Sequence, residues 1–204
     1  MRSTPVSATA RTVFRVMPPE ASVRAFPRAK RTAWAICFTG MSRGLTDLYV
    51  YDLKSSTLRQ LTNDPYADLQ PAWSPDGRRI AFATDRFTTD LGTLDIGAYR
   101  LALVDPASGR VEPVPAFASG KNINPQWSPD GGSLFFISDR DGISNLYRVR
   151  LAGGDFAQLT RVGTGLSGIT NSSPALTVAS STGVAAFSVY RDGKYEIYAL
   201  DTSA

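Results

Sequence analysis

A heptapeptide that occurs twice constrains the fold of this 204-residue chain more than any other feature. Residues 71–77 read Pro-Ala-Trp-Ser-Pro-Asp-Gly, and residues 125–131 read Pro-Gln-Trp-Ser-Pro-Asp-Gly, 54 positions later. A weaker copy of the start, Pro-Ala-Leu, stands at residues 174–176. Self-similarity at a period of about 50 residues indicates a repeat architecture in which each unit is one small group of strands or helices.

Each copy of the heptapeptide predicts a β-hairpin. Ser-Pro-Asp-Gly suits a type I turn, because proline fixes φ at the second position and glycine is favoured at the fourth. An apolar strand with an aligned phenylalanine follows each copy, at Phe82, Phe136 and Phe187. Two further strand-like segments complete the unit, as at 146–147 and 156–160. Four short antiparallel strands per unit, without a helical period, are typical of a β-propeller blade.

The succession of strands divides the chain into blades. Before residue 71 the second, third and fourth strands are recognisable, but no Trp-Ser-Pro-Asp-Gly segment supplies an opening strand. We therefore expect an all-β fold, an incomplete ring of about three to four propeller blades. The expected blades span residues 32–70, 71–124, 125–173 and 174–204. Because an open ring exposes unpaired strand edges, further blades are expected upstream in an intact protein or from another chain.

The N-terminal segment differs from the rest in charge and pattern. Residues 1–31 hold seven basic residues and one acidic residue, whereas the remainder holds 15 basic and 17 acidic residues. Residues 1–31 are expected to be a disordered or non-native tail, or the start of a fragment whose upstream sequence is missing. The nearly neutral body predicts no nucleic-acid partner. We expect no signal peptide and no transmembrane segment in this chain, since no stretch approaches the ~20 apolar residues of a membrane span.

Residue counts exclude several catalytic chemistries. The chain has no histidine and one cysteine, Cys37, which rules out a Ser-His-Asp or Cys-His triad and an intrachain disulfide. Residues 139–142 lack the closing glutamate of a calcium loop, and the glycines of 163–168 are followed by no helix. We therefore expect no enzyme, no catalytic residue, no cofactor and no metal site.

The repeat unit resembles a known family. Pro-x-Trp-Ser-Pro-Asp-Gly, followed by x-Ile-Ala-Phe, Leu-Tyr and Gln-Leu-Thr, resembles the WD40-like repeat of TolB-like β-propellers over nearly the whole chain from residue 32. The resemblance implies a ring of six or more blades, a periplasmic or cell-envelope location, and protein or peptide partners. Propellers of this kind also gate peptidases, and others belong to large bacterial envelope proteins.

A candidate binding surface follows from the propeller geometry. The first strand of each blade lines the central channel, so the residues that enter this strand lie at one mouth of the channel. They are mostly polar and uncharged, and they suit a peptide or a protein loop. The predicted partner-binding residues are Asp68, Gln70, Asn122, Asn124, Asn171 and Ser172. On this view Asn124→Ala weakens the binding of a ligand at the channel mouth and leaves thermal melting nearly unchanged.

Three functions are consistent with the sequence. The leading prediction is a non-catalytic protein- or peptide-interaction scaffold, a fragment of a TolB-like β-propeller. The alternative is an accessory or gating propeller domain of a peptidase, prolyl-oligopeptidase-like or metallopeptidase, whose catalytic domain is absent from this chain. A third possibility is a fragment without a function of its own. The flanking reading frame distinguishes them, because Gly-x-Ser-x-Gly or His-Glu-x-x-His there indicates a peptidase.

Overall fold

The computed structural model describes residues 35–42, 44–115, 117–170 and 174–202, which lie within the unit Thr32–Ala204. The predicted tail 1–31 lies outside the described residues. Within the described part, strands β1 to β15 form four antiparallel sheets and no helix occurs. The all-β prediction is confirmed. Nothing in this part of the chain has the length and apolar character of a membrane-crossing helix.

Two of the sheets have four strands in simple sequential order. In the second sheet the order is β4-β5-β6-β7, and in the third sheet β8, β9, β10 and β11 follow in the same way. Their bounds are β4 Asp68–Trp73, β5 Ile80–Thr84, β6 Arg100–Val104, β7 Val111–Pro113, β8 Asn122–Trp127, β9 Ser133–Ser138, β10 Asn145–Arg150 and β11 Phe156–Gln158. Each of these two sheets therefore has the four neighbouring antiparallel strands that are predicted for a propeller blade.

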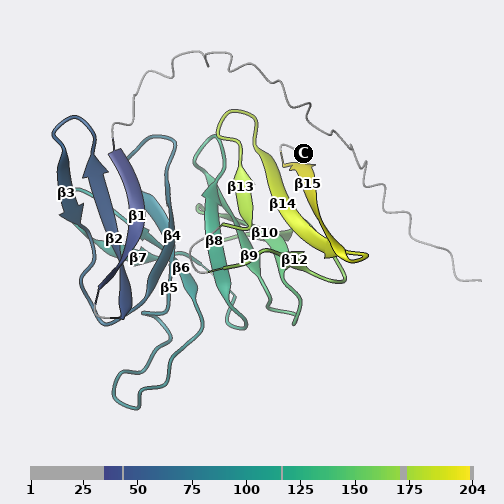
Figure 1. Cartoon of the computed structure of the whole chain (residues 1–204), viewed down its shortest axis with the longest axis horizontal. Helices are drawn as coiled ribbons and strands as arrows, with labels where there is room; N and C mark the ends of the chain where they lie inside the picture. The colour runs from purple at the N-terminus through teal and green to yellow at the C-terminus, as the bar shows by residue number, and fades with distance from the viewer. Residues whose placement is uncertain (1–34, 43, 116, 171–173, 203–204) are drawn as a thin grey trace, which may run out of the picture. The chain divides into compact units, whose positions relative to one another are not determined.

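The first sheet has fewer strands, and the fourth has four strands in a different order. The first sheet has three strands in the order β1-β2-β3, and in the fourth sheet β14 pairs with β15 on one side and with β12 and β13 on the other. Their bounds are β1 Ala35–Ser42, β2 Leu45–Asp52, β3 Thr57–Gln60, β12 Leu166–Ser167, β13 Leu176–Val178, β14 Val184–Arg191 and β15 Lys194–Asp201. Figure 1 shows the sheets side by side, from the purple first sheet to the yellow fourth, as a partial propeller.

The repeated heptapeptide makes a tight turn in both copies. In the second sheet Gly77 N–H donates to the Ser74 carbonyl at 2.9 Å, and the Ser74 hydroxyl donates to Asp76 Oδ1 at 2.6 Å. Gly77 has a φ of 69°, a left-handed conformation that glycine adopts without steric cost. Residues 128–131 repeat these contacts. The turn prediction is therefore confirmed by geometry.

Just before each turn the opening strand contains a β-bulge. The pairing of β4 with β5 shifts between Leu69 and Ala72, and that of β8 with β9 shifts between Ile123 and Gln126. The proline of each heptapeptide lies inside the bulge, where its missing N–H removes no ladder hydrogen bond. The residue before each proline, Gln70 or Asn124, has a left-handed φ of 54° or 55°.

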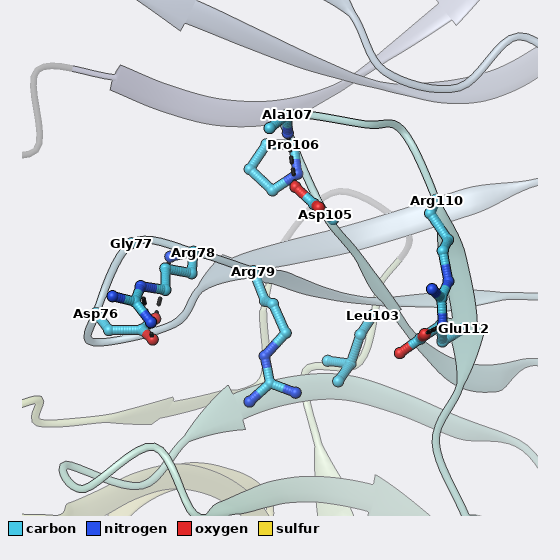
Figure 2. Close-up of a pocket in the computed structure, with 10 residues that line it drawn as sticks. All are labelled: Asp76, Gly77, Arg78, Arg79, Leu103, Asp105, Pro106, Ala107, Arg110 and Glu112. Carbon is cyan, nitrogen blue, oxygen red and sulfur yellow. Dashed lines mark hydrogen bonds and ion pairs between the residues drawn. The ribbon is translucent and has the colours of Figure 1, made fainter.

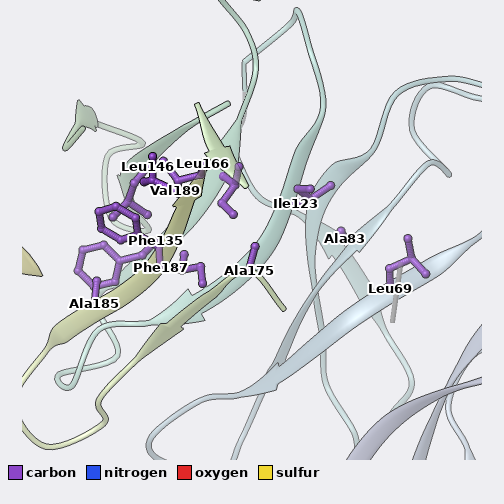
Figure 3. Close-up of a cluster of buried hydrophobic side chains, with 12 residues drawn as sticks. Leu69, Ala83, Ile123, Phe135, Leu146, Leu166, Ala175, Ala185, Phe187 and Val189 are labelled. Carbon is purple, nitrogen blue, oxygen red and sulfur yellow. The ribbon is translucent and has the colours of Figure 1, made fainter. Parts of the chain in front are cut away.

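Apolar side chains fill the contacts between neighbouring sheets. The side chains of β5 alternate between the two faces of the second sheet. Ile80 and Phe82 pack toward the first sheet, and Ala81 packs toward the third. Trp73 contributes to the first of these contacts and Trp127 to the second. Between the third and fourth sheets, Phe135 and Leu146 lie against Phe187 and Val189 (Figure 3).

The opening strands approach one another across the sheets. Strand β4 lies against β8 on one side and against β1 on the other, and β8 also contacts β13. This convergence is what a propeller requires of the strands nearest its axis. It places residues from all four sheets around one region of the described structure.

Candidate functional site

The two bulge residues join the opening strands of different sheets. The Gln70 side-chain oxygen accepts a hydrogen bond from Asn124 N–H at 2.8 Å, and its Nε2 donates to the Thr170 carbonyl at 3.0 Å. The Asn124 amide bonds both backbone groups of Leu176, donating to its carbonyl at 3.3 Å and accepting from its N–H at 3.0 Å. The left-handed backbone at both bulges is what turns these side chains toward the neighbouring strand.

Asp68 is fully buried and paired. Both of its carboxylate oxygens accept from Arg86 Nη2, at 2.9 and 2.8 Å, and Arg86 also bridges to Asp64 at 3.0 Å. Burial raises the pKa of Asp68, and the opposing effect of the Arg86 guanidinium is smaller. Arg140, four residues after Phe136 as Arg86 is after Phe82, stacks on the ring of Phe117 at 4.0 Å and bridges to Asp141 at 3.4 Å.

Asn122 is buried as well. Its Nδ2 donates to the Phe117 carbonyl at 3.5 Å, and its side-chain oxygen has no hydrogen-bond partner among the described residues. Asn171 and Ser172 lie outside the described residues. The structure therefore gives Asp68, Asn122 and Asn124 contacts within the chain, and their role in partner binding stays a prediction.

A pocket of about 360 Å³ lies where the four sheets converge. It brings Gln70 and Asn124 together, and Asp68 and Asn122 do not line it. We call it the channel pocket. Its lining residues come from β1, β4, β8 and the segment before β13, and they are Cys37, Phe38, Thr39, Gln70, Pro71, Asn124, Gln126 and Pro174.

The chemistry of the channel pocket favours binding over catalysis. Its lining residues carry amides, a hydroxyl, proline rings and a phenyl ring, and none of them is charged. Burial raises the pKa of the Cys37 thiol to about 11, so the thiol stays protonated at neutral pH. Amide and hydroxyl groups beside apolar rings suit the main chain of a peptide.

Sequence reasoning missed several lining residues. Gln126 lies inside the repeated heptapeptide, at the variable position between proline and tryptophan. Thr39 lies on β1, which the sequence marked only as a second strand. Strand alternation could have predicted these residues, because every second residue of a strand faces the same side of its sheet.

A larger hollow of about 670 Å³ is lined by loops of the second sheet (Figure 2). Its charged groups have partners nearby, because Arg110 bridges to Glu112 and Arg78 lies 4.0 Å from Asp76. Arg79 points away from both pairs, over the ring of Trp127 at 5.4 Å. These charged side chains already pair within the second sheet, so we place the candidate site in the channel pocket and not in this hollow.

No cluster of three or more metal-ligating side chains occurs within residues 35–42, 44–115, 117–170 and 174–202. The polar groups of the channel pocket act as hydrogen-bond donors and acceptors to the chain itself or to a ligand. The candidate site is therefore the channel pocket, with its hydrogen-bonding side chains on β1, β4 and β8.

Comparison with known proteins gives two kinds of relatives, while no protein-family model matches the chain. The chain is 30% identical over 131 residues to dipeptidyl-peptidase 5 of Porphyromonas gingivalis, covering 60% of this chain and 18% of that protein. It is 40% identical over 81 residues to the Tol-Pal system protein TolB of Alcanivorax borkumensis, covering 40% of this chain and 16% of that protein. The chain thus spans less than a fifth of the length of either relative.

Solved structures show the same fold. The crystal structure of TolB from Acinetobacter baumannii matches 83% of this chain and 38% of its own, with a TM-score of 0.65 and 21% identity. The crystal structure of puromycin hydrolase matches 82% of this chain and 25% of its own, with a TM-score of 0.59 and 20% identity. At these identities the matches establish the arrangement of strands and nothing more.

Proposed function

The chain carries blades of a TolB-like β-propeller, and we propose that it is a non-catalytic scaffold that binds a protein or peptide at the channel pocket. Its proposed location is the bacterial cell envelope, by resemblance to TolB. The observation that carries the proposal is the pocket itself, where Gln126 and Thr39 add uncharged hydrogen-bonding groups beside apolar rings, while the amides of Gln70 and Asn124 hold the inner strands together. Rigid strands hold these groups in place, which reduces the entropy cost of binding.

These groups suit an extended or looped peptide segment as the ligand. Peptide N–H and C=O groups pair with amide side chains as well as with each other, and proline and phenylalanine rings offer apolar contacts to the side chains of a ligand. Gln126 is the best-placed group for a ligand, because among the described residues its Nε2 is bonded only to the neighbouring Pro125 carbonyl at 2.9 Å. A ligand can replace that local contact without breaking the fold.

The test compares two glutamine variants in capture of envelope proteins by the immobilised chain. Gln126→Ala removes an amide from the channel pocket, and we expect roughly fivefold weaker capture, the equivalent of one net hydrogen bond of about 1 kcal/mol. Gln158→Ala is the matched control, since its amide is bonded to the Thr160 carbonyl outside the pocket. Identical partners and yields from both variants would contradict the pocket as the binding site.

A second function is favoured by the relatives named as peptidases. We propose as the alternative that the chain belongs to the propeller of a peptidase whose catalytic residues lie in another part of the protein. Sequencing of the flanking gene tests it, because a Gly-x-Ser-x-Gly or His-Glu-x-x-His segment in the same reading frame supports a peptidase. An uninterrupted propeller sequence followed by neither motif supports the scaffold.

A further inference from the structure

An aromatic cluster lies between the second and third sheets. Its central ring is Phe117, from the segment that joins β7 to β8. Its ring centroid lies 5.8 Å from that of Phe136, 5.1 Å from that of Tyr147 and 4.4 Å from that of Phe156. The guanidinium of Arg140 lies over the same ring, 4.0 Å from the centroid. Phe117 therefore fills a place that three aromatic rings and one cation surround.

The fourth sheet repeats most of the surroundings of this ring. Phe187 of β14 pairs with Tyr198 of β15, and their ring centroids lie 6.2 Å apart. The matching pair of the third sheet, Phe136 with Tyr147, has 6.0 Å between its centroids. Arg191 follows Phe187 by four positions, and the arginine of the third sheet follows its phenylalanine by the same number. Each of these arginines bridges to the aspartate after it at 3.4 Å.

The central ring has no counterpart beside the fourth sheet. Phe117 stands three positions after Val114, whose N–H donates to a carbonyl of β6 at 3.0 Å. Leu159 N–H makes the same bond to β10 at 2.8 Å, so Val162 stands at the position of the phenylalanine in the next repeat. A hollow of about 390 Å³ lies beside Val162. We call this hollow the ring pocket.

The ring pocket presents apolar surface and one cation. Besides Phe187, Tyr198 and Arg191, its lining residues are Val162, Gly163, Thr164 and Val189. Phe187 and Val189 are 6% and 3% exposed, and both belong to the apolar contact with the third sheet (Figure 3). Burial of an apolar group in such a hollow is favourable. A guanidinium over an aromatic face adds an attraction that an aliphatic group does not receive.

The segment that supplies the central ring in the third sheet cannot supply one in the fourth. In the third sheet this ring comes from the connection before the opening strand, whereas the fourth strand contributes a separate ring, Phe156. The corresponding connection of the fourth sheet, residues 159–175, contains no aromatic residue. Gly163, Thr164 and Arg191 are exposed at the ring pocket, so a ring can enter from solvent while its own backbone stays outside.

We propose that the ring pocket binds an aromatic side chain of a partner protein, against Phe187 and Tyr198 and beside the Arg191 guanidinium, as Phe117 is bound one repeat earlier. The chain itself thus shows which group fits a site with these walls. The proposal goes beyond the proposed function, because the ring pocket and the channel pocket have no lining residue in common.

The first experiment locates binding by NMR in the full chain with methyl-labelled valine. The probe is an acetylated and amidated peptide with the sequence of residues 115–119, Pro-Ala-Phe-Ala-Ser. We expect the methyl signals of Val162 and Val189 to shift on titration, because the ring current of a bound phenyl group acts on them. The signal of Val104, which is buried between the first and second sheets, should stay in place. No shift of Val162 and Val189 at millimolar peptide would overturn the proposal.

The second experiment varies the ring of the probe. Cyclohexylalanine in place of phenylalanine keeps the apolar bulk and removes the aromatic face, and we expect the Kd to rise about threefold. Equal affinity of the two peptides would contradict an aromatic site. Benzyl alcohol tests a free aromatic compound as the ligand. If it bound as tightly as the phenylalanine peptide, the site would be one for small molecules and not for a partner protein.

The third experiment supplies the ring from the chain. Val162→Phe restores the phenylalanine of the preceding repeat, and we expect a higher Tm and at least a tenfold rise in the Kd of the peptide. Val111→Phe, at a half-buried valine of β7, is the matched control and should leave the Kd unchanged. Unchanged affinity of Val162→Phe would show that the peptide binds elsewhere. Gln126→Ala should not alter the Kd of this peptide, so failure here leaves the proposed function of the channel pocket intact.

Discussion

At the residue scale, the polar side chains that enter the channel are structural links between sheets. Asn124 is 1% exposed and satisfies both backbone groups of Leu176, 52 positions away in sequence. These contacts argue against the expectation that Asn124→Ala leaves melting unchanged. The sequence marked Asn124 as polar, and it could not show that the backbone of the fourth sheet is its partner.

Asn124→Ala is expected to destabilise the chain by about 2–3 kcal/mol, since it leaves a buried N–H and a buried carbonyl of Leu176 without partners. Alanine also tolerates the left-handed backbone at this position less well than asparagine. Urea unfolding measures the effect, and Gln158→Ala, on an exposed strand, should change stability by less than about 0.5 kcal/mol. A loss for Asn124→Ala as small as that of the control would contradict the linking role.

The Cys37 thiol gives a prediction about pH. Burial raises the pKa of this thiol to about 11, so the folded chain keeps the proton while the unfolded chain loses it near its ordinary value. The free energy of unfolding should therefore fall as the pH rises from about 9 toward 11. Alkylation at pH 8.5 should be roughly a hundredfold slower in the folded chain than in urea, because less thiolate is present. Rates within a few-fold of each other would contradict the burial of this thiol, and Cys37→Ser should remove all labelling.

At the element scale, the hairpin turn depends on one glycine of a neighbouring pair. Gly131 has a φ of 70°, whereas the next residue, Gly132, has an ordinary negative or extended φ. Gly131→Ala should cost about 1–2 kcal/mol from the left-handed backbone, although a Cβ would find space there. Gly132→Ala is the control and should cost less, since its Cβ meets only the side chain of the exposed Asp130. Thermal melting of the two variants gives the comparison, and equal shifts would exclude backbone strain as the cause.

The elements also show how much of the fold follows from sequence. The heptapeptide encodes its own turn through contacts within six residues, such as Ser128 with Asp130 and Ser133, so the hairpins were predictable. The channel pocket was only partly predictable, because Gln70 reaches Thr170 across 100 positions. Such contacts depend on how one sheet is placed against the next, and no local pattern encodes that.

At the scale of the whole molecule, stability depends on the contacts between sheets, since the described strands of each sheet pair only with one another. Trp127 links the second and third sheets in two ways, by packing with Leu103 and Phe136 and by its hydrogen bond to Ala72. A buried side chain of this size contributes more than any surface contact. Removing this ring should therefore weaken the coupling between the second and third sheets.

Trp127→Ala is expected to lower stability by roughly 3–5 kcal/mol, as for other truncations of buried aromatic residues. It should also broaden the thermal transition, because the sheets on either side then unfold less cooperatively. Calorimetry measures both effects, and Trp127→Phe should cost less because a phenyl ring refills most of the space. A loss below about 1 kcal/mol with an unchanged transition width would mean that the sheets are held together elsewhere, and that this tryptophan does not couple them.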